Sequence, residues 1–241
     1  MLPVAEIGQL YEQIANLGGL LKSISVSWAS GVEDEEAVQC LTAIVGVITY
    51  LYHRHWPMGL IVPIVGLRPF GSWVIPALPE GSPYSSFDWY VESAYNEEWQ
   101  AMDAERFLSL VEAEPWQQES HHYDFSVVHL PLRFGSSPNH LGLASRLSIA
   151  SVVSADWARF YDSIEMQRLA LRRLAFQGIG LAFGLAPHNT REAPICALRS
   201  AVGHNEFLAK ALEEHKAGIV YCDEHLRALL GILLSGREPL N

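Results

Sequence analysis

One stretch of the chain reads Gln177-Gly178-Ile179-Gly180-Leu181-Ala182-Phe183-Gly184-Leu185-Ala186-Pro187-His188, and it decides the fold. Upstream, Asp162-Ser163-Ile164-Glu165 has the form of a capping box, in which side chains satisfy the first free amides of a helix. We therefore predict a helix from this box to about Phe183, ended at Gly184. The glycines do not form a dinucleotide-binding motif, because their spacing is wrong and they come late in the helix.

The composition indicates an ordered globular protein. Of its 241 residues 49% are apolar and 18% charged, and the formal net charge is −11. This charge repels phosphate backbones and anionic lipid, so we expect neither nucleic acid nor a membrane as partner. The longest apolar run, Leu41 to Tyr52, is too short to span a bilayer. With three cysteines and no pattern of a secretory leader, we expect a cytoplasmic protein with free thiols.

Periodicity and capping residues place further helices and strands along the chain. Apolar spacing and end residues predict helices at residues 3–21, Glu33 to His53, Asn96 to Ala113, Asn205 to Lys216 and Asp223 to Leu234. Short apolar runs predict strands at Met58 to Leu67, Phe125 to Leu132, Ser148 to Ser154 and Gly218 to Tyr221. This order of elements predicts an α/β protein.

The second half of the chain resembles the archaemetzincins, a family of zinc metallopeptidases. Their signature is His-Glu-x-x-His-x-x-Gly-x-x-His-Cys, followed by Cys-x-Met and then Cys-x-x-Cys. Gly184 matches the glycine of this signature, and His188 falls at its first cysteine. Cys196-Ala197-Leu198 stands where Cys-x-Met is expected, and Cys222-Asp223-Glu224-His225 stands for Cys-x-x-Cys. The gaps between these pieces are a few residues longer than in the family.

The resemblance covers roughly residues 58 to 230 and implies a metzincin or zincin-like fold. It implies a mixed, mainly parallel sheet with an antiparallel edge strand, packed with helices. We therefore expect an archaemetzincin-like domain at 57–241 and an N-terminal helical extension at 1–56. The apolar faces of the extension predict packing of its two helices on each other or a homodimer. The alternative is a chance likeness in an unrelated α/β protein, which strand order would reveal.

In the family, three histidines hold the catalytic zinc and the glutamate is the general base. The resemblance places Gln177, Gly178, Leu181 and Pro187 at these four positions. None of the four can replace the zinc ligands or the base. We therefore expect a pseudoenzyme that binds a protein or peptide partner or acts as a scaffold. The alternative is a zinc-dependent peptidase or hydrolase with displaced ligands, for which His204, His215 and Glu214 are the candidates.

The resemblance also implies a second, structural zinc site, held by four cysteines in the family. Here the corresponding residues are His188, Cys196, Cys222 and His225. Two imidazoles and two thiolates make a sound tetrahedral zinc shell. The alternative is a metal-free core in which both thiols are simply buried.

Two other groups of residues allow a chemical and an ordinary interpretation. His121, His122 and Asp124 are able in principle to bind metal or to act as acid and base, but they follow a polar run typical of a solvated loop. We favour the loop. Cys40 lies on the apolar face of a predicted helix, where a small buried thiol is expected.

Overall fold

A central sheet of five strands organises the protein. The computed structural model describes residues 23–55, 66–119, 122–135, 137, 139–190 and 193–234. The strand order is β2-β1-β5-β8-β7. These strands are β1 (Ser23–Trp28), β2 (Gly66–Gly71), β5 (Tyr123–Val128), β7 (Leu143–Arg146) and β8 (Ala150–Ser154). The first four in this order pair in parallel, and β7 runs antiparallel to β8 at the edge. The predicted sheet arrangement is confirmed.

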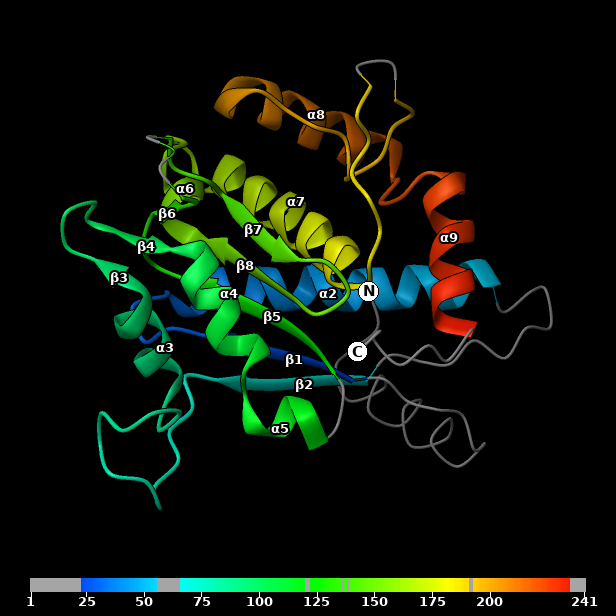
Figure 1. Cartoon of the computed structure of the whole chain (residues 1–241). Helices are drawn as coiled ribbons and strands as arrows, with labels where there is room; N and C mark the ends of the chain where they lie inside the picture. The colour runs from blue at the N-terminus through cyan, green and yellow to red at the C-terminus, as the bar shows by residue number, and fades with distance from the viewer. Residues whose placement is uncertain are drawn as a thin grey trace.

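The two faces of the sheet carry different helices. Helix α2 (Asp34–His55) packs against α7 (Ile164–Ala182) on one face, while α3 (Phe87–Ala94), α4 (Ala104–Glu112) and α5 (Pro115–Glu119) belong to the other. Figure 1 shows α4 and α5 in front of the sheet and α2 behind it. Because side chains alternate along a strand, Phe125 faces α7 and its neighbours Asp124 and Ser126 face the opposite side.

Smaller elements complete the described part of the fold. A three-stranded sheet is formed by β3 (Tyr95–Asn96), β4 (Ala101–Asp103) and β6 (Leu132–Arg133). The remaining helices are α6 (Ala155–Arg159), α8 (Gly203–Ala217) and α9 (Asp223–Leu234), and α8 and α9 lie at the top and right of Figure 1. Among the described residues, no helix has the length and apolar character needed to cross a membrane.

Several predicted elements are confirmed, with small shifts at their ends. Helices α2, α7, α8 and α9 and strands β5 and β8 lie close to their predicted ranges. The N-cap of α7 is Ser163, whose hydroxyl accepts the amide of Met166 at 3.1 Å. The helix predicted at residues 3–21 and most of the strand predicted at Met58 to Leu67 lie outside the described residues.

Two predictions of local structure are wrong, and one strand was missed. The segment from Asn96 to Ala113 is not one helix: Asn96 caps a turn by accepting the amide of Trp99, and α4 begins only after Asp103. The carboxylate of Asp103 accepts the amides of Glu105 and Arg106 in the first turn of α4. Residues 218–221 are not a strand, because Gly218 ends α8 in a left-handed conformation with φ of 65°. Strand β1 was not predicted.

The described part of the predicted N-terminal extension takes part in the central core. Residues 23–55 supply β1 to the middle of the sheet and α2 to its covering layer. The apolar face of α2 packs on α7 of the same chain, and Cys40 on it is fully buried, as expected. Burial raises the pKa of the Cys40 thiol to about 12. The boundary predicted after residue 56 lies outside the described residues.

Candidate metal centre

The end of α7 is fixed by a glycine that no other residue can replace without strain. Gly184 has φ of +93°, in the left-handed region. Its amide donates to the carbonyl of Leu181, and the amide of Leu185 donates to the carbonyl of Gly180, which is the Schellman pattern. A Cβ at position 184 would lie 2.5 Å from Ser148 Oγ. The predicted helix with its glycine stop is confirmed.

Among the described residues, the four that the resemblance places at the zinc ligands and the base belong to no metal-capable group. Gln177 is half-buried and its Nε2 donates to the carbonyl of Arg199 at 3.4 Å. Leu181 is half-buried and Pro187 is exposed. Gly178 packs so closely on the sheet that a Cβ would lie 2.8 Å from a ring carbon of Phe125. A glutamate at position 178 would therefore require the sheet face to repack.

This close packing predicts an effect for a single methyl group. Gly178→Ala is expected to lower the free energy of unfolding by about 1–2 kcal/mol, because overpacking costs about 1–3 kcal/mol and exceeds the helix propensity that alanine adds. Gly46→Ala is the matched control: Gly46 is also in a helix, but its Cβ would have nothing within 4 Å. It is expected to stabilise the protein by up to about 1 kcal/mol. Urea unfolding measures both, and equal effects would contradict the packing argument.

The residues nominated as displaced ligands do not come together. The ring of His204 is stacked between Trp157 and Phe160, with centroids 4.1 and 3.9 Å away. Glu214 forms ion pairs with Arg173 and Arg199. His215 is exposed in the last turn of α8. Among the described residues, neither group of metal-capable side chains includes any of the three.

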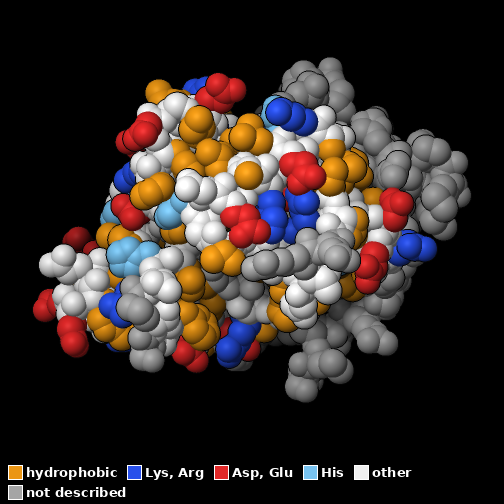
Figure 2. Space-filling view, turned by 90° about the horizontal axis from the view of Figure 1, so that it is seen from above, with side chains coloured by type: hydrophobic (Ala, Val, Ile, Leu, Met, Phe, Trp, Pro, Cys, Tyr) orange, Lys and Arg blue, Asp and Glu red, His pale blue; other side chains and the backbone are white. Residues whose placement is uncertain are grey.

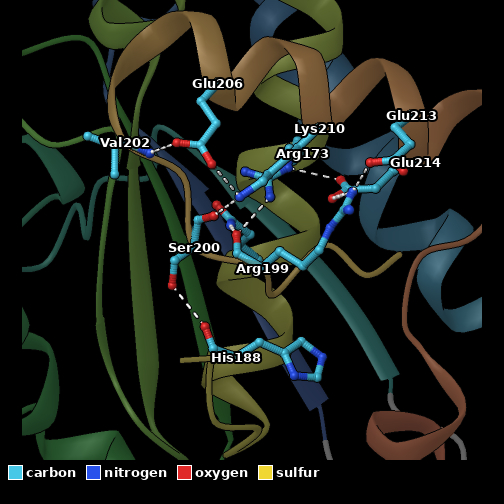
Figure 3. Close-up of polar contacts among 10 residues, drawn as sticks. Arg173, His188, Arg199, Ser200, Val202, Glu206, Lys210, Glu213 and Glu214 are labelled. Carbon is cyan, nitrogen blue, oxygen red and sulfur yellow. Dashed lines mark hydrogen bonds and ion pairs between the residues drawn. The ribbon is translucent and has the colours of Figure 1, made fainter. Parts of the chain in front are cut away.

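A buried ion-pair network joins α7 to α8 and to the loop between them (Figure 3). Arg173 Nε lies 2.9 Å from Glu214 Oε2, and Arg173 Nη2 donates to the carbonyl of Arg199 at 2.9 Å. Arg199 also pairs with Glu214 at 3.2 Å and with Glu213 at 2.7 Å. Burial lowers the pKa of Arg173 and raises that of Glu214, and the attraction between them opposes both shifts. The network fixes the loop at Arg199.

The same loop carries part of a cluster of two cysteines and two histidines. His188 is held beside Arg199 by a parallel bridge, in which its amide donates to the carbonyl of Leu198 at 2.9 Å. Ser200 Oγ donates to the carbonyl of His188 at 2.9 Å. Cys196 lies on this loop, and its neighbour Ala197 donates to the carbonyl of Val220. The loop thus approaches the segment that leads into α9.

The other half of the cluster comes from the start of α9. Cys222 directly precedes this helix and its carbonyl accepts the amide of Leu226, while His225 lies in the first turn. The four side chains are thus brought together from positions up to 37 residues apart along the chain, His188 and His225 being the most distant pair.

The four side chains have the spacing of a tetrahedral metal shell. One ligand atom from each of His188, Cys196, Cys222 and His225 lies within 4.8 Å of the other three. The Sγ atom of Cys196 is 3.2 Å from His225 Nδ1, and that of Cys222 is 3.4 Å from His188 Nε2 and 3.6 Å from His225 Nδ1. Zinc bonds of about 2.3 Å to sulfur and about 2.0–2.1 Å to nitrogen place such atoms about 3.6 Å apart.

The environment of the cluster suits a cation. Burial raises the pKa of Cys196 to about 12, and burial followed by the neighbouring His188 lowers the pKa of His225. The imidazole of His225 is therefore neutral and has a lone pair to donate. A bound zinc ion would hold both thiols as thiolates. The donor set fits zinc, and all four positions of a tetrahedral shell would be filled by protein.

Comparison with known proteins agrees with this architecture. No family model and no curated protein matches the sequence. The archaemetzincin structure from Methanopyrus kandleri is similar over 89% of this chain and 96% of its own, with a TM-score of 0.55 and 13% identity. The chain has the archaemetzincin fold.

Two further structures support this result. A zinc-dependent peptidase from Methanocorpusculum labreanum has a TM-score of 0.55 and 12% identity over 86% of this chain and 99% of its own. The archaemetzincin from Archaeoglobus fulgidus, solved with malonate, has a TM-score of 0.50 and 11% identity over 85% and 98%. Identities this low establish a shared fold, and activity must be argued from the site.

A second group of side chains lies on the other face of the archaemetzincin fold. Glu114, His122 and Asp124 each offer a ligand atom within 4.8 Å of the other two. The side chains of His122 and Asp124 are only 10% and 12% exposed, so the prediction of a solvated loop is wrong for them. His121 lies outside the described residues. The missed signal is the alternation of Asp124 and Ser126 with apolar residues in β5, which turns polar groups toward one face.

Proposed function

We propose that the chain is a catalytically inactive archaemetzincin-like protein, a binding or scaffold module whose last helix is fixed by a structural zinc ion. The proposal rests on which residues stand in α7 and in the turn that follows it. The helix and its glycine stop are present, and the resemblance assigns Gln177, Gly178, Leu181 and, beyond the helix, Pro187 to the positions of ligands and base. A metallopeptidase needs three protein ligands, an open position for water and a carboxylate base.

The zinc ion is assigned to His188, Cys196, Cys222 and His225 by their chemistry and spacing. A shell of four protein ligands leaves no position for a substrate, so a zinc ion here would stabilise the fold rather than catalyse a reaction. It would join the loop that carries Cys196 to the first turn of α9. All three cysteines are free, which suits a reducing compartment such as the cytoplasm.

Exposed apolar side chains support a binding role. Phe160 and Ile164 are 64% and 61% exposed, and Val202 is 82% exposed. Phe160 stacks on His204, two residues after Val202, so these side chains gather where α7 and α8 begin. Exposed apolar groups in one place are typical of contacts with a protein or peptide. On the face seen in Figure 2, basic side chains lie among acidic ones and form no continuous basic surface.

The absence of peptidase activity can be tested directly. Purified protein incubated with a complex peptide mixture is expected to release no products above the buffer control, as followed by mass spectrometry. Adding phenanthroline, a zinc chelator, is expected to change nothing in this assay. Cleavage that the chelator abolishes, and that is also lost in His204→Ala or Glu214→Gln, would overturn the proposal in favour of a zinc-dependent hydrolase with displaced ligands. Loss in both variants also separates the protein's own activity from a contaminating protease.

A further inference from the structure

A cavity of about 380 Å³ lies on the face of the sheet that α7 does not cover. Its floor is polar, because Ser25 pairs in register with Asp124 and Ser27 with Ser126 on the neighbouring strand. Its walls are mainly aromatic and include Trp73, Phe87 and Trp116. Trp73 Nε1 donates to Ser27 Oγ at 3.1 Å, which fixes one wall to the floor.

The cluster of Glu114, His122 and Asp124 lines this cavity. Glu114 is 5% exposed and follows α4, whereas His122 and Asp124 come from the start of β5. His122 Nε2 lies 3.4 Å from Asp124 Oδ1. The segment after α4 and the start of β5 therefore bring one imidazole and two carboxylates to a single point at the cavity wall.

Gln117 holds the cluster in place. Its Nε2 donates to Asp124 Oδ2 and to the carbonyl of His122 at 3.4 Å. One carboxylate oxygen of Asp124 is thus used for orientation, and the other, Oδ1, is the one near His122. This is the arrangement found around metal ligands, whose second oxygen is commonly fixed by a hydrogen bond from the surrounding protein.

Within the described residues, the carboxylates of the cluster are paired with an imidazole and with no permanently charged side chain. Neither Glu114 nor Asp124 forms an ion pair with a lysine or arginine there, and Arg68 on the cavity rim is exposed. Tyr90 and Trp116 lie within hydrogen-bonding range of the Glu114 carboxyl group. Its Oε2 atom is buried and makes no hydrogen bond of standard geometry with a described residue. Two buried carboxylates this close are costly unless a cation or a shared proton compensates them.

We propose that Glu114, His122 and Asp124 bind a divalent cation of the manganese or iron type. One nitrogen and two carboxylate ligands suit these ions, whereas the thiolates of the other cluster select zinc. Three protein ligands leave coordination positions for water or a small ligand, and the cavity beside them provides the space. The site lies on the opposite face of the sheet from α7, so it is separate from the lost catalytic positions.

The test titrates the zinc-loaded protein with Mn²⁺ as the only added metal. Calorimetry is expected to show one Mn²⁺ bound per chain, and pulsed electron paramagnetic resonance is expected to show one coordinated imidazole nitrogen. Manganese is the weakest competitor in the divalent series and will not displace zinc from thiolates. Gln117→Leu is expected to weaken Mn²⁺ binding about 10–100-fold, as for other residues that orient a ligand. Glu114→Gln and Asp124→Asn are expected to weaken it further.

The controls separate this site from adventitious binding and from unfolding. Glu112→Gln changes an exposed carboxylate near Glu114 that pairs with Arg146, and Mn²⁺ affinity is expected to stay unchanged. Absence of stoichiometric Mn²⁺ binding by the wild type, or a Mn²⁺ signal without an imidazole nitrogen, would overturn the proposal even if a variant failed to fold. Equal affinity in Glu114→Gln and wild type would overturn it as well.

Discussion

Cys222→Ser is expected to lower the free energy of unfolding by about 5 kcal/mol or more, measured by denaturant titration of zinc-loaded protein. The reason is that zinc binding contributes about 10–16 kcal/mol to the folding of small zinc domains, and loss of one of four ligands removes much of this term. The first turn of α9 would then lose its link to the loop at Cys196. A strong chelator is expected to destabilise the wild type and to have little further effect on the variant.

Cys40→Ser is the matched control for this change. Cys40 is also a fully buried thiol, but it lies on α2 and belongs to neither group of metal-capable residues among the described positions. Its substitution is expected to cost about 1–3 kcal/mol, the penalty for burying a hydroxyl group, both with and without chelator. Equal costs for the two variants, with no effect of chelator on the wild type, would indicate a metal-free core around Cys222.

Arg173→Met is the second change with a large expected effect, about 3–5 kcal/mol of unfolding free energy. The side chains of Arg173 and Glu214 are 1% and 4% exposed, so removing the guanidinium leaves a buried carboxylate poorly compensated. The carbonyl of Arg199 also loses a donor. Thermal or denaturant unfolding followed by circular dichroism measures the loss.

A double substitution and a surface pair test the origin of this effect. Arg173→Met with Glu214→Gln is expected to cost less than the sum of the two single changes, because no carboxylate then stays buried without its main partner. Arg168→Met removes an exposed ion pair with Glu35, in which both side chains are at least half exposed, and is expected to cost less than about 1 kcal/mol. Additive costs, or equal costs for Arg173 and Arg168, would contradict the argument from burial.

The sequence was most informative where local chemistry decides structure. The end of α7 depends on a left-handed residue, and Gly184 provides it at the predicted position. The resemblance to the archaemetzincin signature also groups His188 with Cys196, Cys222 and His225, and these four side chains lie together although up to 37 residues separate them. Spacing alone does not predict this proximity, because it depends on how the loop after α7 returns to α9.

The errors arise where tertiary contacts override local patterns. Asn96 is a good helix cap, but here it caps a turn, and the competing cap Asp103 starts the helix. The polar run before His122 resembles a surface loop, yet β5 begins directly after it and carries Asp124 into the protein. The polar residues of β1, Ser23, Ser25 and Ser27, alternate with apolar ones and line the same face, a pattern of period two that indicates a strand.

Gly178 has a clear role in the packing of α7. A glycine in the middle of a helix costs about 1 kcal/mol relative to alanine, yet here it allows α7 to lie directly on Phe125 and Ser151. Gly178 is therefore part of the packing of α7 on the sheet, and Arg173 joins the same helix to Glu214 of α8.

The most direct test of the account is X-ray absorption spectroscopy of zinc in protein purified without added metal, using Glu114→Gln so that only the cysteine and histidine cluster contributes. We expect one zinc per chain with two sulfur ligands at about 2.3 Å and two nitrogen ligands at about 2.0–2.1 Å, unchanged when peptides are added. A zinc shell made only of nitrogen and oxygen donors, or a chain that retains no zinc, would contradict a closed structural site at His188, Cys196, Cys222 and His225.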